Sequence, residues 1–436
     1  AMQTVFRIRD IKQIQDSTKR LFRVELELTS DNDQDLQILT KRIREETFPN
    51  AQGWSRLGSL LLKLEKPKQA EEVYQILLQQ TTDETKNGWL YRGLGNCKQH
   101  QANYEEAIRL YKKSIEIYKK YYPNHPDLAA SYNNIGLLYG KMGEYAKALS
   151  YFEKALSIRQ QSLPPNHPDL ALCYNNIGLL YGKMGEYAKA LSYYEKALSI
   201  WQQSLPPNHP HLAGSYNNIG LVYDNMGEYP KALSYYEKAL AIRQQSLPPN
   251  HPDLADSYNN IGLVYVNIGE YPKALSYYEK ALAIRQQSLP PNHPDLASSY
   301  NNIGSVYNSM GEYIKALSHY EKALAIQQQS LPPNHPHLAA SYNNIGLVYV
   351  NIGEYPKALS YYEKALAIRQ QSLPPNHPDL ASSYNNIGSV YNSMGEYIKA
   401  LSLCKRAVEI AEQSLSPNHP HLKLYKDNLD KVKNKL

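Results

Sequence analysis

Cysteine is scarce in this chain of 436 residues, and its three copies, Cys97, Cys173 and Cys404, stand far apart. An odd number without paired spacing argues against a disulfide framework and against a zinc site. A reducing, cytoplasmic setting is therefore expected. No apolar run approaches the roughly 18 residues of a membrane span, and the N-terminus lacks the apolar core of a secretion signal. The sequence predicts no membrane segment.

A strong charge of either sign is also missing. The 47 Lys and Arg residues nearly balance the 41 Asp and Glu residues. The surplus of +6 collects in "YKKSIEIYKK" (111–120) and "KVKNKL" (431–436). The helices between these segments carry no basic stripe for phosphates. This argues against nucleic-acid binding and leaves proteins or peptides as the expected partners.

Phenylalanine and tryptophan are rare, at 4 and 3 residues, whereas tyrosine is abundant, at 39. The tyrosines follow a 42-residue repeat with the signature "YNNIG". Self-similarity at a fixed period indicates an array of stacked units rather than separate globular domains. The seven copies begin at Tyr132, Tyr174, Tyr216, Tyr258, Tyr300, Tyr342 and Tyr384.

Each copy predicts two antiparallel helices. In the copy at Tyr258, Pro252 suits a first helical position and Gly269 supplies a left-handed helix end. The segment "EYPKALSYYEKALAIRQQS" then forms a second helix, and "LPPNHP" starts the next unit. Neither helix buries its apolar face alone, so the units must stack.

The order of residue types within one copy closely resembles the tetratricopeptide repeat (TPR). In the copy at Tyr216 the matching positions are Tyr216, Ile219, Gly220, Tyr223, Ala232, Tyr236 and Ala239. The 42-residue form, with "NN" in the first helix and "HPD" opening it, is similar to the repeats of kinesin light chains. The resemblance implies an all-α fold, a right-handed superhelical TPR solenoid (alpha-alpha superhelix), whose concave groove binds a protein or peptide.

The chain is predicted to have four parts, and its array shows one internal duplication, in which residues 257–318 and 341–402 are identical. The predicted parts are a β-hairpin (1–30), a connecting helix (31–50), nine repeats of which two are degenerate and seven have 42 residues (51–419), and a C-terminal capping helix and tail (420–436).

The hairpin is predicted from "TVFRIRDIKQI" and "RLFRVELEL", which alternate apolar and polar residues around a turn. The segment "MQTVFRI" resembles one that follows the catalytic glutamate strand in arginine-type mono-ADP-ribosyltransferases, some of which carry such repeats. This implies a catalytic domain upstream of residue 1, for which the chain would recruit substrates. Glu25 and Glu27 form a nominal E-x-E, but at period two they occupy the outer face of a strand and are interpreted as solvent-facing.

Neither catalysis nor metal binding is predicted for the chain itself. "NHP" occurs eight times, but packed helices lie about 8–10 Å apart, too far for successive histidines to converge on one ion. We interpret these histidines as helix-start residues. No cysteine stands in a nucleophile arrangement, and Cys404 replaces a core aromatic. No cofactor is expected.

The first asparagine of each "YNNIG" is the candidate binding residue. In related repeats this position lines the concave surface, and an amide there offers donors and an acceptor to the backbone of an extended peptide. The alternative is an inter-repeat ladder of bonded amides, and both interpretations stay open. For the second asparagine a structural role is favoured. The first asparagines are Asn133, Asn175, Asn217, Asn259, Asn301, Asn343 and Asn385.

Positions farther along the first helix vary between copies. This variation is expected if these positions select among ligands while the constant asparagine contacts the backbone of the bound peptide. The candidates at these positions are Leu221, Asp224, Asn225, Leu263, Asn267 and Asn308. The sequence therefore predicts a protein–protein interaction scaffold. It makes no prediction about self-association.

Overall fold

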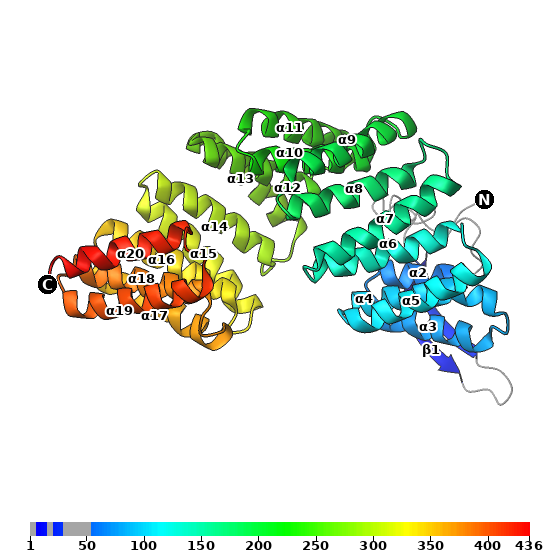
Figure 1. Cartoon of the computed structure of the whole chain (residues 1–436), viewed down its shortest axis with the longest axis horizontal. Coiled ribbons are helices and arrows are strands. Elements are labelled where there is room, and N and C mark those ends of the chain that lie inside the picture. Colours follow the sequence, from blue (N-terminus) through cyan, green and yellow to red (C-terminus); the bar gives the residue numbers. More distant parts are fainter. Residues whose placement is uncertain (1–5, 15–20, 29–53) are drawn as a thin grey trace. The chain divides into compact units, whose positions relative to one another are not determined.

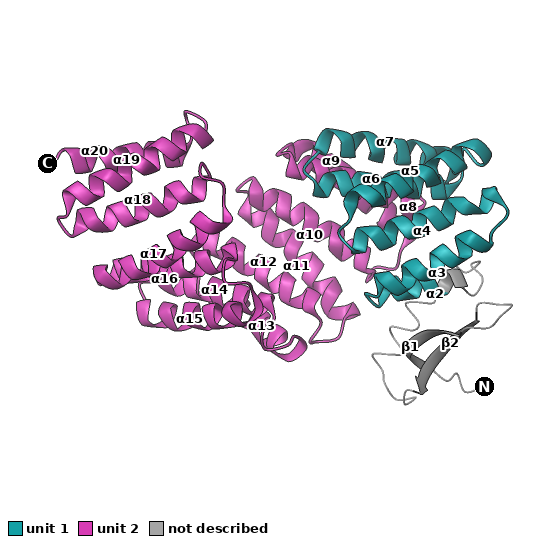
Figure 2. Cartoon of the chain, turned by 90° about the horizontal axis from the view of Figure 1, so that it is seen from below, with its two compact units in different colours: residues 1–165 teal, residues 166–436 magenta. Residues whose placement is uncertain are grey.

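The computed structural model describes residues 6–14, 21–28 and 54–436, with side chains from residue 57 onward. The chain divides into two compact units, Ala1–Pro165 and Asn166–Leu436 (Figure 2). Both units contain antiparallel helices in sequential pairs (Figure 1). The expected all-helical architecture of paired antiparallel helices is therefore confirmed for residues 54–436.

Two strands lie near the N-terminus. Strand β1 (Phe6–Ile14) pairs antiparallel with β2 (Leu21–Leu28), and the register shifts between Ile8 and Asp10. The intervening turn and the connecting helix predicted over 31–50 lie outside the described residues. The link to ADP-ribosyltransferases stays a prediction.

The first unit contains helices that run in pairs up to the first regular repeat. They are α2 (Trp54–Lys63), α3 (Pro67–Gln80), a 3₁₀ turn (Glu84–Lys86), α4 (Asn87–His100), α5 (Tyr104–Tyr121), α6 (Pro126–Lys141) and α7 (Tyr145–Ser162).

The second unit continues the same alternation, in which a helix that starts at Pro is followed by one that starts at Tyr. Its helices are α8 (Pro168–Lys183), α9 (Tyr187–Ser204), α10 (Pro210–Asn225), α11 (Tyr229–Ser246), α12 (Pro252–Ile268), α13 (Tyr271–Ser288), α14 (Pro294–Ser309), α15 (Tyr313–Ser330), α16 (Pro336–Ile352), α17 (Tyr355–Ser372), α18 (Pro378–Ser393), α19 (Tyr397–Ser414) and α20 (Pro420–Lys433).

Local sequence explains where the first helix of each repeat begins. The Nδ1 atom of His251 accepts a hydrogen bond from the backbone N–H of Asp253 at 3.2 Å, and Pro252 occupies the first helical position. A side-chain acceptor here satisfies an N–H that has no partner within the helix. All eight "NHP" histidines form this cap, at 3.1–3.2 Å. The interpretation of these histidines as capping residues is confirmed.

Glycine sets how closely the two helices of one repeat pack. A Cβ on Gly262 would lie 2.8 Å from the ring of Tyr278, and the ring is buried against Ala274. In the last full pair, Cys404 takes the tyrosine position and Gly388 faces its Sγ atom. Cys404 is buried, and burial raises the pKa of its thiol, which makes it an inert core residue.

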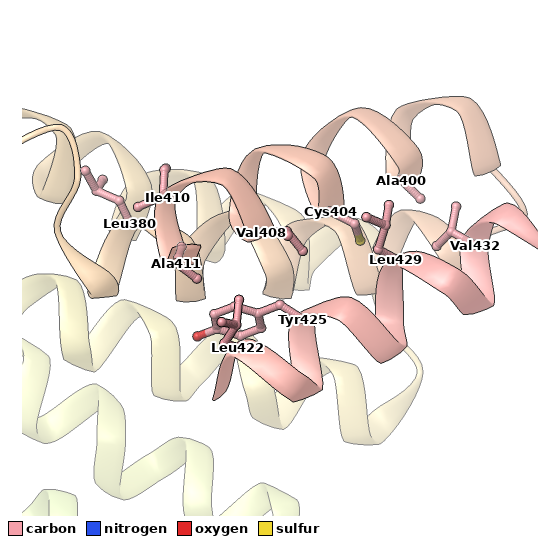
Figure 3. Close-up of a cluster of buried hydrophobic side chains, with 11 residues drawn as sticks. Leu380, Ala400, Cys404, Val408, Ile410, Ala411, Leu422, Tyr425, Leu429 and Val432 are labelled. Carbon is pink, nitrogen blue, oxygen red and sulfur yellow. The ribbon is translucent and has the colours of Figure 1, made fainter. Parts of the chain in front are cut away.

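The C-terminal helix α20 completes the core of the second unit (Figure 3). Leu422, Tyr425, Leu429 and Val432 of α20 are buried, in one cluster with Cys404 of α19. Helix α20 thus covers the apolar face that α19 would otherwise expose. The division into nine repeats and a cap remains a prediction. The packing of α20 on α19 agrees with it.

Candidate binding face on the first helices of the repeats

The two asparagines of each motif join consecutive repeats. In the second unit, Asn260 on α12 donates its Nδ2–H to Oδ1 of Asn217 on α10, at 3.0 Å. The donor is the second asparagine of one repeat, and the acceptor is the first asparagine of the repeat before it. We call this contact a rung. The five rungs of the second unit join Asn218 to Asn175, Asn260 to Asn217, Asn302 to Asn259, Asn386 to Asn343, and Asn428 to Asn385, at 2.8–3.1 Å.

The rungs continue into helices that lack the full motif. On α20, Asn428 stands at the second-asparagine position and donates to Asn385, which is only 5% exposed. In the first unit, Asn134 on α6 donates to Asn96 on α4, at 3.0 Å. Sequence reasoning missed Asn96, because Arg92 occupies the first-asparagine position of that degenerate repeat. The structure therefore contains the inter-repeat ladder of bonded amides that was one of the two interpretations of the motif. Asn133 of the first unit lies half-buried on α6.

One rung is missing from the second unit. No hydrogen bond among the described residues joins Asn344 on α16 to Asn301 on α14, and Oδ1 of Asn301 is buried without a partner. A buried acceptor without a partner costs about 1–3 kcal/mol relative to a satisfied one. The step from α14 to α16 therefore differs from its neighbours although the motif is the same.

The rungs engage the oxygen of the first asparagine but not its NH₂ group. Within the described part of the second unit, the structure records no acceptor for the Nδ2 atoms of Asn217, Asn259 and Asn343, and all three side chains are half-buried. Such a group can donate to a carbonyl oxygen. The sequence suggested that each first asparagine offers a peptide both donors and an acceptor. In the structure its oxygen already accepts a rung, so only the NH₂ group is expected to contact a ligand.

Residues four, seven and eight positions after the first asparagine share its side of the helix. We call these four positions on the first helices of the second unit the asparagine face. Leu221 on α10 and Leu263 on α12 are each 42% exposed on it. Leucines this exposed beside uncommitted amide donors are suited to contact an apolar side chain of a partner.

The other candidate positions form a second set of contacts between repeats. Asn267 donates to Asp224 at 3.2 Å, and Asn351 donates to Asn308 at 3.0 Å. Burial raises the pKa of the Asp224 carboxyl above its ordinary value, and the hydrogen bond from Asn267 opposes this shift. Asn225, in contrast, is exposed at the end of α10. Of the predicted selectivity residues, the leucines and Asn225 are accessible, and the other three are engaged.

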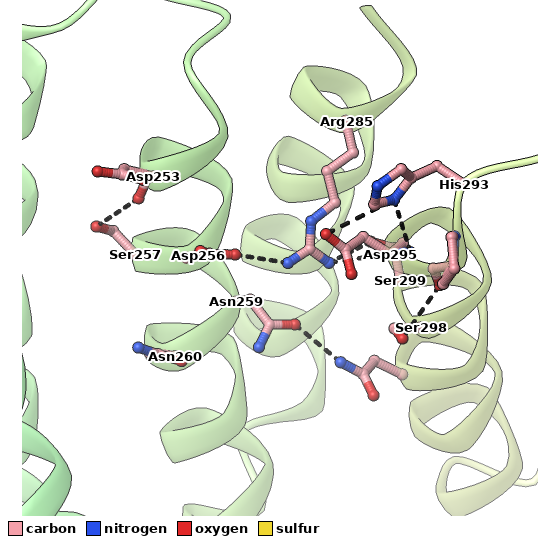
Figure 4. Close-up of polar contacts among 12 residues, drawn as sticks. Asp253, Asp256, Ser257, Asn259, Asn260, Arg285, His293, Asp295, Ser298 and Ser299 are labelled. Atoms are coloured by element: carbon pink, nitrogen blue, oxygen red, sulfur yellow. Dashed lines mark hydrogen bonds and ion pairs between the residues drawn. The ribbon is translucent and has the colours of Figure 1, made fainter. Parts of the chain in front are cut away.

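Arginine forms a separate set of contacts at the other end of the same helices (Figure 4). Arg285 on α13 donates to Ser299 Oγ on α14 at 2.8 Å and to Asp256 Oδ1 on α12 at 2.7 Å. Arg243 makes the corresponding contact with Ser257, at 2.6 Å. These bonds fix the second helix of one repeat on the first helix of the next, so they position the asparagine face without being part of it.

The described residues contain no group of three or more His, Cys, Asp or Glu side chains that could hold a metal ion. No described helix is long and apolar enough to cross a membrane.

The repeats match the family model of the tetratricopeptide repeat over most of the chain. Together the matches run from residue 50 to 371 with a short gap, and from 380 to 421. The chain therefore belongs to the tetratricopeptide-repeat proteins. Individual matches span 50–120, 87–161, 127–203, 169–245, 211–287, 291–371 and 380–421.

Solved structures with the same fold include the apo forms of RapI and of a bacterial quorum sensor. The apo form of RapI is 18% identical, with 86% of this chain and 98% of that chain covered and a TM-score of 0.61. The apo form of the quorum sensor NprR from B. thuringiensis is 17% identical, with 86% and 99% covered and a TM-score of 0.57. At these identities the likeness concerns the fold alone.

The chain is also similar to a kinesin-light-chain-type protein of Podosopora anserina with nearly identical TPR-like repeats. That structure is 25% identical, covers 48% of this chain and 99% of its own, and has a TM-score of 0.43. Among curated protein sequences, none matches the chain.

Proposed function

We propose that this chain is a protein–protein interaction scaffold whose asparagine face binds an extended peptide or an extended segment of a partner. The observation that carries the proposal is the uncommitted NH₂ group of Asn217, Asn259 and Asn343, repeated on α10, α12 and α16 beside exposed leucines. Amide donors repeated along a stack of helices suit the repeated carbonyl groups of an extended chain. In related repeats the first-asparagine position lines the concave surface, and the proposal places this face there.

The rungs make the proposed donors rigid. Each first asparagine is fixed through its oxygen by the neighbouring repeat, so the orientation of its NH₂ group is set before a ligand arrives. Binding then orders few protein side chains, which lowers the entropic cost of association. The same residue thus has a structural role through its oxygen and a proposed binding role through its nitrogen.

Asparagine-to-aspartate substitutions separate the two roles. In the triple variant Asn217→Asp, Asn259→Asp, Asn343→Asp, the carboxylates still accept the rungs but have no NH₂ group to donate. Random peptides displayed on phage are enriched on the full chain, and binding of the enriched pool is compared between the natural chain and the variant. We expect loss of binding, with a smaller fall in melting temperature than removal of the rungs causes, because the rungs remain and only the partial burial of the new carboxylates costs stability. Undiminished binding by the variant would rule out the proposal.

A matched control separates this effect from that of added negative charge. Ser234, Ser276 and Ser360 occupy equivalent, exposed positions on the second helices α11, α13 and α17. The variant Ser234→Asp, Ser276→Asp, Ser360→Asp carries the same extra charge away from the asparagine face. It is expected to bind the pool as the natural chain does.

The role of the chain in an ADP-ribosyltransferase remains the alternative, and it rests on the segment "MQTVFRI" alone. Reading the gene upstream of the codon for Ala1 tests it. A coding region with a catalytic E-x-E would favour substrate recruitment to that domain. A start codon at Met2 would remove the alternative and leave the scaffold proposal as it is.

A further inference from the structure

The asparagine face alternates between apolar and polar helices along α12, α14 and α16. Four and seven positions after the first asparagine, α12 carries Leu263 and Val266, and α16 carries Leu347 and Val350. Helix α14 has Ser305 and Asn308 at the same positions. Leu263 and Leu347 are each 42% exposed, whereas the valines are half-buried. Two equally exposed leucines therefore flank a polar helix.

No charged residue occupies the asparagine face on these three helices. The face carries Lys183 on α8 and Asp224 on α10, but from α12 to α16 all twelve positions are Asn, Leu, Val or Ser. Covering such a face with an unpaired charge would remove that charge from water without compensation. An uncharged ligand segment fits these helices best.

The missing rung lies in the middle of this stretch. The buried Oδ1 of Asn301 on α14 has no hydrogen-bond partner among the described residues, and the structure records none for the amide of Asn344 on α16. Both amides can therefore turn towards a ligand without breaking a rung. At Asn259 and Asn343, by contrast, the oxygen is already committed.

We propose that α12, α14 and α16 bind one uncharged, extended peptide segment with two aliphatic side chains, one packed on Leu263 and one on Leu347. Its backbone between them lies against the amide of Asn301. This inference rests on the proposed function and names its ligand class. Packed helices lie about 10 Å apart, so the two leucines are separated by roughly 20 Å. An extended chain rises about 3.3 Å per residue, which places the aliphatic side chains about six residues apart.

A spacing of about six also places both side chains on one side of the ligand. In a β-strand, side chains alternate with a period of two, and in a polyproline II helix the period is three. Six is a multiple of both. The inference therefore holds for either extended conformation of the ligand.

The duplicated segment provides an internal comparison. Residues 341–402 repeat 257–318, yet the corresponding stretch α16–α18–α20 lacks the same features. There the oxygen of Asn385 accepts from Asn428, and the position equivalent to the second leucine is Lys431. We therefore expect one such site in the chain and a stoichiometry of one peptide per chain.

The test uses a fluorescein-labelled peptide of Ser, Thr, Asn and Gly with two leucines about six residues apart. Comparison peptides have the leucines about three residues apart, or have Glu and Lys between them. Anisotropy titrations of the full chain should show one-to-one binding, weakened several-fold in both comparison peptides. Leu263→Ser and Leu347→Ser should each weaken binding about five-fold, since each removes part of a buried leucine contact. Ile314→Ser on α15, an exposed aliphatic residue outside the asparagine face, should leave it unchanged.

The inference is overturned if the peptide does not bind, if the spacing of its leucines has no effect, or if Ile314→Ser weakens binding as much as Leu263→Ser. The phage-enriched peptides separate this failure from that of the proposed function. If they bind through Asn217, Asn259 and Asn343 but carry charges in place of paired aliphatic residues, the scaffold proposal stands and this one falls. If they are insensitive to those asparagines, both fall.

Discussion

The Nδ2 atom of Asn302 donates a hydrogen bond to Oδ1 of Asn259 at 2.8 Å and thereby links two repeats across 43 residues of sequence. The bond engages the oxygen of Asn259, whereas no acceptor among the described residues is recorded for its Nδ2 atom. The asparagine motif therefore forms a contact between repeats through the amide oxygen. The proposed ligand binds the amide NH₂ group, which that contact does not use.

Removing a rung should destabilise the array more than removing the same side chain where no rung exists. Asn302→Ala leaves the half-buried oxygen of Asn259 without its donor, and we expect a loss of about 1 kcal/mol in the free energy of unfolding. Asn344→Ala is the matched control, because the structure records no rung from Asn344 to Asn301. Urea unfolding of both variants measures the difference. Equal losses would show that the rung contributes no stability.

Gly262 should not tolerate a side chain. An alanine Cβ there would lie 2.8 Å from the buried ring of Tyr278, and overpacking of this kind costs about 1–3 kcal/mol. Gly214 on α10 is the control, since a Cβ at Gly214 meets no atom within 4 Å. Gly214→Ala should stabilise the chain by about 0.5–1 kcal/mol, through higher helix propensity. Thermal unfolding distinguishes the two, and a stabilising Gly262→Ala would contradict the packing described above.

Because of the arginine contacts, alanine substitutions of two serines at equivalent positions should change the free energy of unfolding differently. Ser257 accepts from Arg243 at 2.6 Å, whereas the buried Oγ of Ser215 has no partner because Trp201 replaces the arginine. Ser257→Ala should therefore lower the free energy of unfolding by about 1 kcal/mol. Ser215→Ala removes an unsatisfied hydroxyl group and should be neutral or stabilising. A larger loss at Ser215 than at Ser257 in denaturant titrations would contradict this assignment.

Asp224 should make stability depend on pH in a defined direction. Burial raises its pKa in the folded state above the ordinary value of 3.8. Its contribution to stability is therefore fully present below about pH 3.8 and is lost as the pH rises through the folded-state pKa. Asp224→Asn stays uncharged and its oxygen still accepts from Asn267. The variant should gain stability relative to the natural chain between about pH 4 and pH 7. A difference that does not change with pH would show that burial of this carboxylate has no cost.

Much of the fold follows from local patterns, because the groups that set it are close in sequence. His251 caps the N–H of a residue two positions away, and Gly269 ends the same helix with a positive φ. The partners of the asparagines lie 43 residues away, so the motif predicts an amide on one side of a helix but not which atom of it remains uncommitted.

The two copies of the duplicated segment show this limit directly. Asn301 and Asn385 occupy equivalent positions in identical sequences, yet only Asn385 accepts a rung, from a helix outside the duplication. Asn96 was missed for a related reason, since it acts from a different position of a degenerate repeat. Local sequence sets each helix, and neighbouring repeats decide which of its polar atoms are committed.

The central claim is that the first asparagines bind through nitrogen and stabilise through oxygen. The most direct measurement compares peptide affinity and melting temperature in two triple variants, Asn217→Asp, Asn259→Asp, Asn343→Asp and Asn260→Ala, Asn302→Ala, Asn386→Ala. The account predicts that the first variant loses affinity for the enriched peptides with only a small fall in melting temperature, whereas the second variant has the larger fall because its rungs are removed. Retained affinity in the first variant, or a fall in its melting temperature as large as that of the second, would contradict it.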